Sequence, residues 1–191
     1  MKEAPDERQR IFGEILSRAK SGKYLQVSPR PEQRLRVDSV TRSDMSALRW
    51  IDDAQITFTA YLCPWWENIR KTIAKAAEEG KNGSISLLNN GNVPTPLEVT
   101  AKAIEPITTF TVSCGSEKIT LNNLTVASGE EIKIDHNEDG IQSITAAGES
   151  AIASRNGQSS DEIMLKRGIN KIAFSGDGKM IVTVKARGRY Y

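Results

Sequence analysis

The sequence from Pro96 to the C-terminus consists of short apolar stretches separated by turn residues, at intervals of roughly eight to twelve residues. Within these stretches apolar and polar residues alternate, which is typical of strands with one buried face. Gly176, Asp177 and Gly178 are expected to close a hairpin. Many short strands with no helix between them predict a β-sandwich or jelly roll. We expect strands at residues 97–104, 108–113, 117–121, 131–135, 141–146, 151–154, 162–165, 170–175 and 180–187.

The first 66 residues show a different pattern, one helix followed by strands. The helix is predicted by apolar residues that recur on one face, namely Phe12, Ile15, Leu16 and Ala19. Asp6 is expected to cap its N-terminus and Gly22 to follow its C-terminus. Short strands are expected at 24–27 and 35–40.

A longer strand is predicted from Gln55, because apolar and polar residues alternate strictly. Its inner face would hold Ile56, Phe58, Ala60 and Leu62. Pro64 is expected to end it, since proline cannot donate to a strand ladder. Two tryptophans follow at once, and we expect this point to join the first unit to a second.

The expected organisation is a helix-plus-strands unit (1–66), a connecting segment (67–88) and a β-sandwich (89–191). In the connecting segment Ile69, Ile73 and Ala77 are spaced as on a helix, although the same residues fit a polar strand. Residues 80–83 and 89–92 have turn chemistry. One helix and three strands are few for a closed core, so the first unit is expected to be incomplete, or completed by a partner chain.

Charge and cysteine content narrow the classes of function. The net charge is +2, with 11 basic and 9 acidic residues in 1–66 and 15 of each in 67–191. Neither part has the concentrated positive charge of a nucleic-acid-binding protein. Cys63 and Cys114 form neither a disulfide framework nor a zinc pattern, which favours a reducing environment. No secretion signal and no apolar run of membrane-spanning length occurs.

Candidate catalytic and metal-binding residues are sparse. Residues 135–140 match the first half of a calcium loop, but Ala146 occupies the position of the bidentate glutamate, so a plain hairpin turn is favoured. His136, the only histidine, is expected to be a solvated turn residue. Cys63 has no expected base partner and is predicted to be a buried cysteine at a strand end. We therefore expect no enzyme activity, no cofactor and no metal.

Two groups of residues are candidates for binding. Trp50, Trp65 and Trp66 would either anchor an interface or fill a seam between domains. The basic aromatic C-terminus is a possible docking tail, with charged protection of an edge strand as the alternative; it comprises Arg187, Arg189, Tyr190 and Tyr191. A carbohydrate-binding β-sandwich module is the alternative function. It has few aromatic rings to use, because Phe110 and Phe174 fall on apolar faces.

An ordered series of short segments runs through most of the chain. They are GKYLQV (22–27), LCPWW (62–66), NNGNVPTP (89–96), LNNL (121–124), GEEIKID (129–135), LKRGINKI (165–172) and VTVKARGRY (182–190). In this order and spacing the series resembles the distal tail protein family of long-tailed phages, also described as siphovirus-type tail components. The helix before the first segment is similar to the single helix of that family.

The resemblance implies a virion structural protein of a phage or prophage baseplate, assembled in the bacterial cytoplasm and located in the virion tail. In the family, N-terminal domains form a hexameric ring at the tip of the tail tube, and a galectin-like C-terminal sandwich projects outward. The partners implied are the tube, tail-associated and receptor-binding proteins, without nucleic acid, membrane, cofactor or catalysis. The family's N-terminal domain begins with further strands before the helix, so we expect the 1–66 unit to be a partial ring domain.

Overall fold

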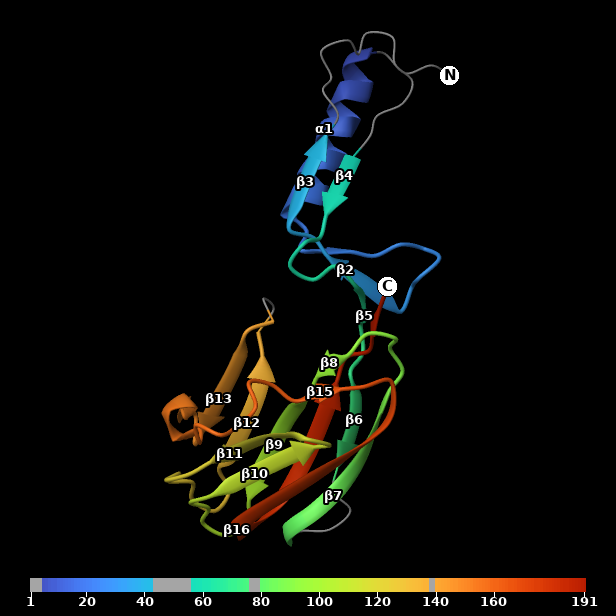
Figure 1. Ribbon diagram of the computed structural model, residues 1–191. Coiled ribbons are helices and arrows are strands. Elements are labelled where there is room, and N and C mark those ends of the chain that lie inside the picture. Colours follow the sequence, from blue (N-terminus) through green and yellow to red (C-terminus); the bar gives the residue numbers. More distant parts are fainter. Residues whose placement is uncertain (1–4, 43–55, 76–79, 138–139) are drawn as a thin grey trace. The chain divides into compact units, whose positions relative to one another are not determined.

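The computed structural model describes residues 5–42, 56–75, 80–137 and 140–191, and Figure 1 shows it as a ribbon. The chain divides into two compact units, Met1–Trp66 and Glu67–Tyr191. Strands and one helix make up the described elements, which confirms the predicted fold class. In the part of the chain that is described, no helix combines the length and the apolar character needed to cross a membrane.

The N-terminal unit begins with helix α1 (Pro5–Ser21). Because proline is well suited to the first helical position, the helix starts there, and Asp6 lies in the first turn rather than at the predicted cap. Leu16 is buried, whereas Ile15 is half exposed, so the apolar face is narrower than predicted. An exposed ion pair joins Arg10 to Glu14 at 2.6 Å, one helical turn further along.

Two short strand pairs follow in this unit. Strand β1 (Tyr24–Leu25) pairs antiparallel with β2 (Gln33–Arg36), and β3 (Ser39–Arg42) with β4 (Ile56–Thr59). In β4 the predicted alternation is confirmed: Ile56 and Phe58 are half-buried, while the threonines between and after them are exposed.

The predicted end of the β4 strand at Pro64 is wrong. The chain leaves the strand after Thr59, because one carboxylate oxygen of Asp38 accepts hydrogen bonds from the N–H groups of Tyr61 and Leu62, at 2.7 and 2.9 Å. These bonds turn the backbone before the proline is reached. Leu62 is consequently half exposed instead of facing inward as predicted.

The C-terminal unit contains most of the strands, and β5 (Trp66–Asn68) lies where the two units meet in the sequence. Residues 151–154, predicted as a strand, form the short 3-10 helix η1 (Ile152–Ser154) instead. The remaining strands are β6 (Thr72–Lys75), β7 (Gly80–Asn89), β8 (Thr95–Pro96), β9 (Glu98–Ala103), β10 (Phe110–Cys114), β11 (Glu117–Leu121), β12 (Glu131–His136), β13 (Gln142–Ala146), β14 (Glu149–Ser150), β15 (Met164–Leu165), β16 (Gly168–Ala186) and β17 (Arg189–Tyr190).

The long strand β16 is shared by both layers of the sandwich. Its first half pairs with β7 on one side and β10 on the other, and β11 continues beyond β10. Its second half pairs with β6 and β9, and β12, β13 and β14 follow in that order. One layer is therefore β11-β10-β16-β7 and the other is β6-β16-β9-β12-β13-β14 (Figure 1).

The point at which β16 changes layer is the segment 176–178, where a hairpin was predicted. That prediction is wrong, because the strand continues through the segment with a shift of register between Ser175 and Met180. The carboxylate of Asp177 accepts hydrogen bonds from the N–H groups of Thr108 and Thr109, at 3.0 and 3.1 Å. It also accepts from the Thr108 hydroxyl at 2.5 Å. These bonds, that of the Thr108 hydroxyl foremost, lower the pKa of Asp177 to about 2.

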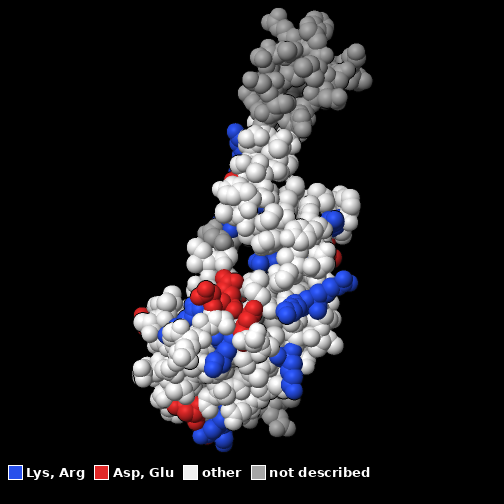
Figure 2. Space-filling view, in the orientation of Figure 1, with Lys and Arg blue, Asp and Glu red and all other residues white. Residues whose placement is uncertain are grey.

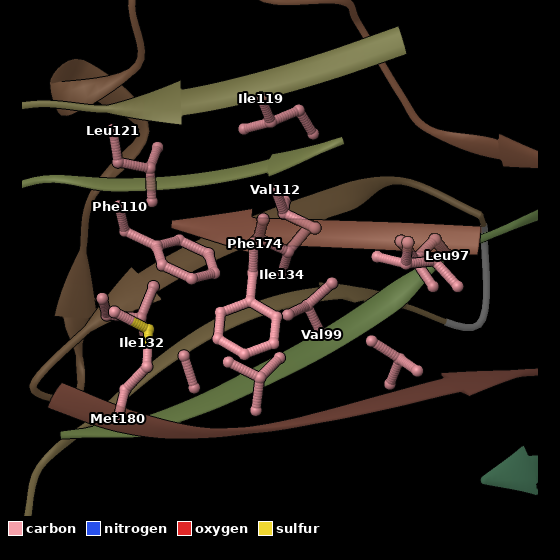
Figure 3. Close-up of a cluster of buried hydrophobic side chains, with 14 of the residues drawn as sticks. Leu97, Val99, Phe110, Val112, Ile119, Leu121, Ile132, Ile134, Phe174 and Met180 are labelled. Atoms are coloured by element: carbon pink, nitrogen blue, oxygen red, sulfur yellow. The ribbon is translucent and has the colours of Figure 1, made fainter. Parts of the chain in front are cut away.

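Side chains from both layers meet in one core. Phe110 of β10 and Phe174 of β16 are 0% and 4% exposed, and Figure 3 shows their rings close to Met180, Ile132 and Val99. Removing such a ring costs roughly 3–5 kcal/mol, a large part of a typical domain stability of about 5–15 kcal/mol. The two phenylalanines therefore have a structural role that excludes them from the surface.

Part of the expected connecting segment belongs to the sandwich. Residues 72–75 and 80–89 are β6 and β7, and both pair with β16. The turn predicted at residues 80–83 is wrong, because these residues lie inside β7. Gly83 faces the ring of Phe174, whose nearest atom is 2.5 Å from where a Cβ would lie, so glycine serves close packing here. Ile73 lies in β6, which confirms the strand alternative, and Ala77 is outside the described residues.

We predict that Gly178→Ala destabilises the C-terminal unit by roughly 1–3 kcal/mol, because its Cβ would overlap fixed backbone atoms. That Cβ would lie 2.3 Å from the carbonyl oxygen of Pro106 and 3.0 Å from that of Glu105. Urea unfolding followed by circular dichroism measures the change. Gly157→Ala is the matched control, since no atom lies within 4 Å of its Cβ position. Equal midpoints for the two variants would contradict the prediction.

Candidate interaction surfaces

Two members of the predicted tryptophan group, Trp65 and Trp66, are the last residues of the N-terminal unit. Trp65 and Trp66 are both half-buried. The guanidinium of Arg30 lies 5.2 Å from the centre of the Trp66 ring, a cation–π distance that holds this ring in the unit. Trp50 lies outside the described residues. A role of these tryptophans at an interface or in a seam between domains stays a prediction.

The basic side chains of the predicted docking tail are used inside the C-terminal unit. Arg187 donates hydrogen bonds to the carbonyl oxygens of Asn68 and Ile69, at 2.7 and 2.6 Å. Nε of Arg189 lies 3.1 Å from a carboxylate oxygen of Glu67, and both side chains are largely buried. The guanidinium groups therefore bind the start of this unit to its end.

The backbone near Arg189 strengthens the same attachment. The N–H groups of Asn92 and Val93 both donate to the carbonyl oxygen of Arg189, at 2.9 and 3.1 Å. The phenol oxygen of Tyr190 accepts a bond from the Asn68 amide at 3.1 Å, whereas Tyr191 is 78% exposed. Of the four predicted docking residues, Tyr191 presents the most surface, and docking by the tail stays a prediction.

We predict that Glu67→Ala loosens the attachment of β17, because the largely buried charge of Arg189 loses its partner. We expect the free energy of unfolding to decrease by roughly 2 kcal/mol, which is less than for a fully buried ion pair. Hydrogen exchange at the Asn92 and Val93 amides, which donate to Arg189, should become faster. Glu149→Ala is the control, since Glu149 is exposed in β14. Unchanged exchange at both amides in Glu67→Ala would show that the ion pair does not hold the strand.

The segment resembling half a calcium loop is the turn of the β12–β13 hairpin. The N–H of Asn137 donates to the carbonyl oxygen of Ile141 at 3.0 Å, and the Asn137 side chain accepts from the N–H of Ile141 at 2.9 Å. Ala146 pairs with Ile132 inside the hairpin. The predicted hairpin is confirmed by this pairing, and Glu138 and Asp139 of its loop lie outside the described residues. Among the described residues no three His, Cys, Asp or Glu side chains gather as a metal site.

His136 is not the solvated turn residue that was predicted. Strand β12 extends to it and pairs it with Gln142, so the period of two places His136 on the same inward face as Ile132 and Ile134. Its side chain is only 5% exposed, and Nε2 is 3.8 Å from a carboxylate oxygen of Glu162. Among the described residues, neither ring nitrogen has a hydrogen-bond partner. Burial lowers the pKa of His136, and the nearby Glu162 opposes this effect in part.

We predict that His136 makes stability depend on pH just below neutrality. Because its pKa in the folded protein is below the ordinary 6.5, the unfolded chain binds more protons in this window. The contribution of His136 to the free energy of unfolding therefore has its full value above pH 6.5 and decreases as the pH falls below 6.5. Urea midpoints at pH values on both sides of 6.5, in the natural protein and in His136→Gln, measure the effect. Equal slopes in the two proteins would contradict it.

An open cleft of about 570 Å³ lies beside this histidine in the C-terminal unit. Its walls come from β11, β13, the segment around η1 and the chain leading into β15. The apolar lining residues are Ile141, Ile144, Ile152 and Met164. The polar ones are Glu117, Gln142, Arg155, Ser160, Asp161 and Glu162.

Three carboxylates and one guanidinium give the cleft an acidic character. Arg155 is held by the carbonyl oxygen of Ser160 and by Asp161, at 3.2 Å from the latter's carboxylate. Glu117 accepts a 2.5 Å bond from the N–H of Met164. On the face that Figure 2 shows, a group of acidic side chains of the C-terminal unit has lysine and arginine side chains around it. No single motif marks this cleft, because its residues are scattered over positions 117–164.

Two features of the described part of the chain weigh against the carbohydrate-binding alternative. Both phenylalanines are buried, and the lining of the cleft contains no aromatic ring on which a sugar could stack. Cys63 is buried, as predicted. Burial raises the pKa of Cys114, and the neighbouring Glu117 adds to this, so its thiol is not activated.

The comparison with known proteins identifies the sandwich. The family model described as "Siphovirus-type tail component, C-terminal domain" matches residues 90–190. A solved structure of the SPP1 Dit (gp 19.1) protein, described as a paradigm of the hub adsorption apparatus in phages that infect Gram-positive bacteria, is similar in fold. It has a TM-score of 0.65 and 11% sequence identity over 98% of this chain and 74% of that one. No match was found among curated proteins.

The match with the family model covers more than half of the chain, including every strand of the sandwich from β9 to β16. The predicted resemblance to distal tail proteins is thereby confirmed. This protein belongs to the family of siphovirus-type tail components.

Proposed function

We propose that this chain is a structural component of a phage or prophage tail tip, which joins the tail tube to receptor-binding parts by protein–protein contacts. The family match over residues 90–190 is the observation that supports this function most directly. Structural roles of this kind depend on surfaces that bind other chains, and the C-terminal unit offers such a surface in its open cleft. Because the sandwich core is complete without a ligand, its binding role rests on the exterior.

The N-terminal unit would supply the contacts between copies in a ring. Among the described residues of this unit, three large apolar side chains are at least half exposed, so a partner chain has apolar surface to cover here. They are Ile15 (50%), Tyr61 (69%) and Leu62 (50%). The Asp38 carboxylate holds the turn that displays Tyr61 and Leu62, so these two side chains are presented on a defined backbone.

The proposal predicts that an antibody against this chain labels the tips of tails in particles from the phage or prophage that encodes it. Electron microscopy of labelled particles measures the position. An antibody against the tube protein, which should label the tail along its length, is the control. Tails that are never labelled at the tip, in particles shown to be intact, would contradict the proposed location.

Self-association is a separate measurement on the purified full chain. Sedimentation velocity at increasing concentration should show assembly beyond the monomer, and Leu62→Ser should reduce it. Ile169→Ser is the matched control, since Ile169 is 78% exposed on β16 in the other unit. A strict monomer at high concentration would exclude ring formation by this chain alone.

A further inference from the structure

The cleft beside His136 contains a carboxylate that the surrounding residues do not neutralise. Glu162 lines the cleft, and its side chain is 37% exposed. Within 4 Å, the one basic group found for it among the described residues is His136, at 3.8 Å, which is beyond hydrogen-bond distance. Because burial keeps the imidazole neutral near pH 7, it does not compensate the charge of Glu162. Arg155, the one guanidinium of the cleft, is already held by Ser160 and Asp161.

Buried polar atoms without partners lie at this cleft and next to it. Among the described residues, neither ring nitrogen of His136 nor the side-chain nitrogen of Gln142 has a hydrogen-bond partner. Gln142 lines the cleft, and Nε2 of His136, whose side chain is 5% exposed, lies 3.8 Å from the Glu162 carboxylate that also lines it. Unsatisfied buried polar groups are costly, and a bound segment that supplies an acceptor to the Gln142 amide would remove part of this cost.

Apolar side chains flank the carboxylate. Ile141, next to β13, and Ile152 of η1 are 64% and 55% exposed, and Met164, which also lines the cleft, is half-buried. An acidic group set among exposed aliphatic side chains complements a long basic side chain, whose methylene stem packs on apolar surface while its charged end reaches a carboxylate. A cleft of about 570 Å³ accommodates a few such side chains.

We propose that this cleft binds a basic, aliphatic peptide segment of another tail protein, with a lysine or arginine of that segment paired to Glu162. The inference rests on the proposed function, because it names the kind of partner that the tail component contacts. The two free oxygens of a carboxylate suit an arginine fork best. Ile141 and Ile152 contact the aliphatic side chains on either side of the basic residue.

The probe is an array of overlapping synthetic peptides that covers the other tail proteins encoded with this chain, overlaid with the purified full-length protein. Bound peptides should contain a lysine or arginine beside aliphatic residues. Glu162→Gln and Ile141→Ser should each weaken binding to them by about tenfold or more. Glu149→Gln and Ile169→Ser change the same residue types outside the cleft and should leave binding unchanged. Urea unfolding confirms that all four variants fold.

Three outcomes would overturn the proposal. They are an array without any bound peptide, bound peptides that are acidic, and binding that is insensitive to changes at Glu162 and Ile141. Self-association that depends on Glu162, seen by sedimentation, would instead make the occupant a second copy of this chain. If tail tips are labelled but no peptide binds through the cleft, this inference fails and the proposed function stands. If no tail is labelled, the proposed function itself fails.

Discussion

The bend of β16 at Asp177 is the constraint on which the C-terminal unit depends. One strand supplies hydrogen bonds to both layers, so the register of β7 and β10 against its first half fixes where β9 and β6 pair with its second half. The Asp177 carboxylate ties this bend to Thr108 and Thr109, immediately before β10 begins. Because the pKa of Asp177 is about 2, the carboxylate is ionised over the whole range in which proteins normally work. The two layers therefore form one cooperative core around Phe110 and Phe174.

Strand β16 also positions the C-terminal residues. β17 follows β16 after two residues, so Arg187 and Arg189 reach Glu67, Asn68 and Ile69 as soon as β16 ends. The guanidinium groups of both arginines take part in these hydrogen bonds and ion pairs. A basic run that suggests an external docking tail in the sequence is thus also used to close the unit to which it belongs, and Tyr191 presents the most surface of the four residues.

The alternation of apolar and polar residues in the sequence was sufficient to find most strands and the sandwich. In 98–103, 131–136 and 180–186 the inward-facing and outward-facing residues differ clearly in polarity. It failed where glycines suggested turns. In 80–83 and 176–178 glycine allows close packing inside strands, against the Phe174 ring and the backbone of Glu105 and Pro106. A single sequence does not separate these two uses of glycine, since the difference lies in long-range contacts.

The cleft could not be predicted for a related reason. Its carboxylates and aliphatic residues come from β11, β13, η1 and the segment before β15, and each position is ordinary in its own local sequence. The inward position of His136 was predictable in part, because its spacing from Ile132 and Ile134 is that of residues on one face of a strand. Phe110 and Phe174 are buried in the core, whereas the cleft presents a mixed acidic and aliphatic surface. Such chemistry suits peptide segments better than sugars, in line with the proposed contacts between tail components.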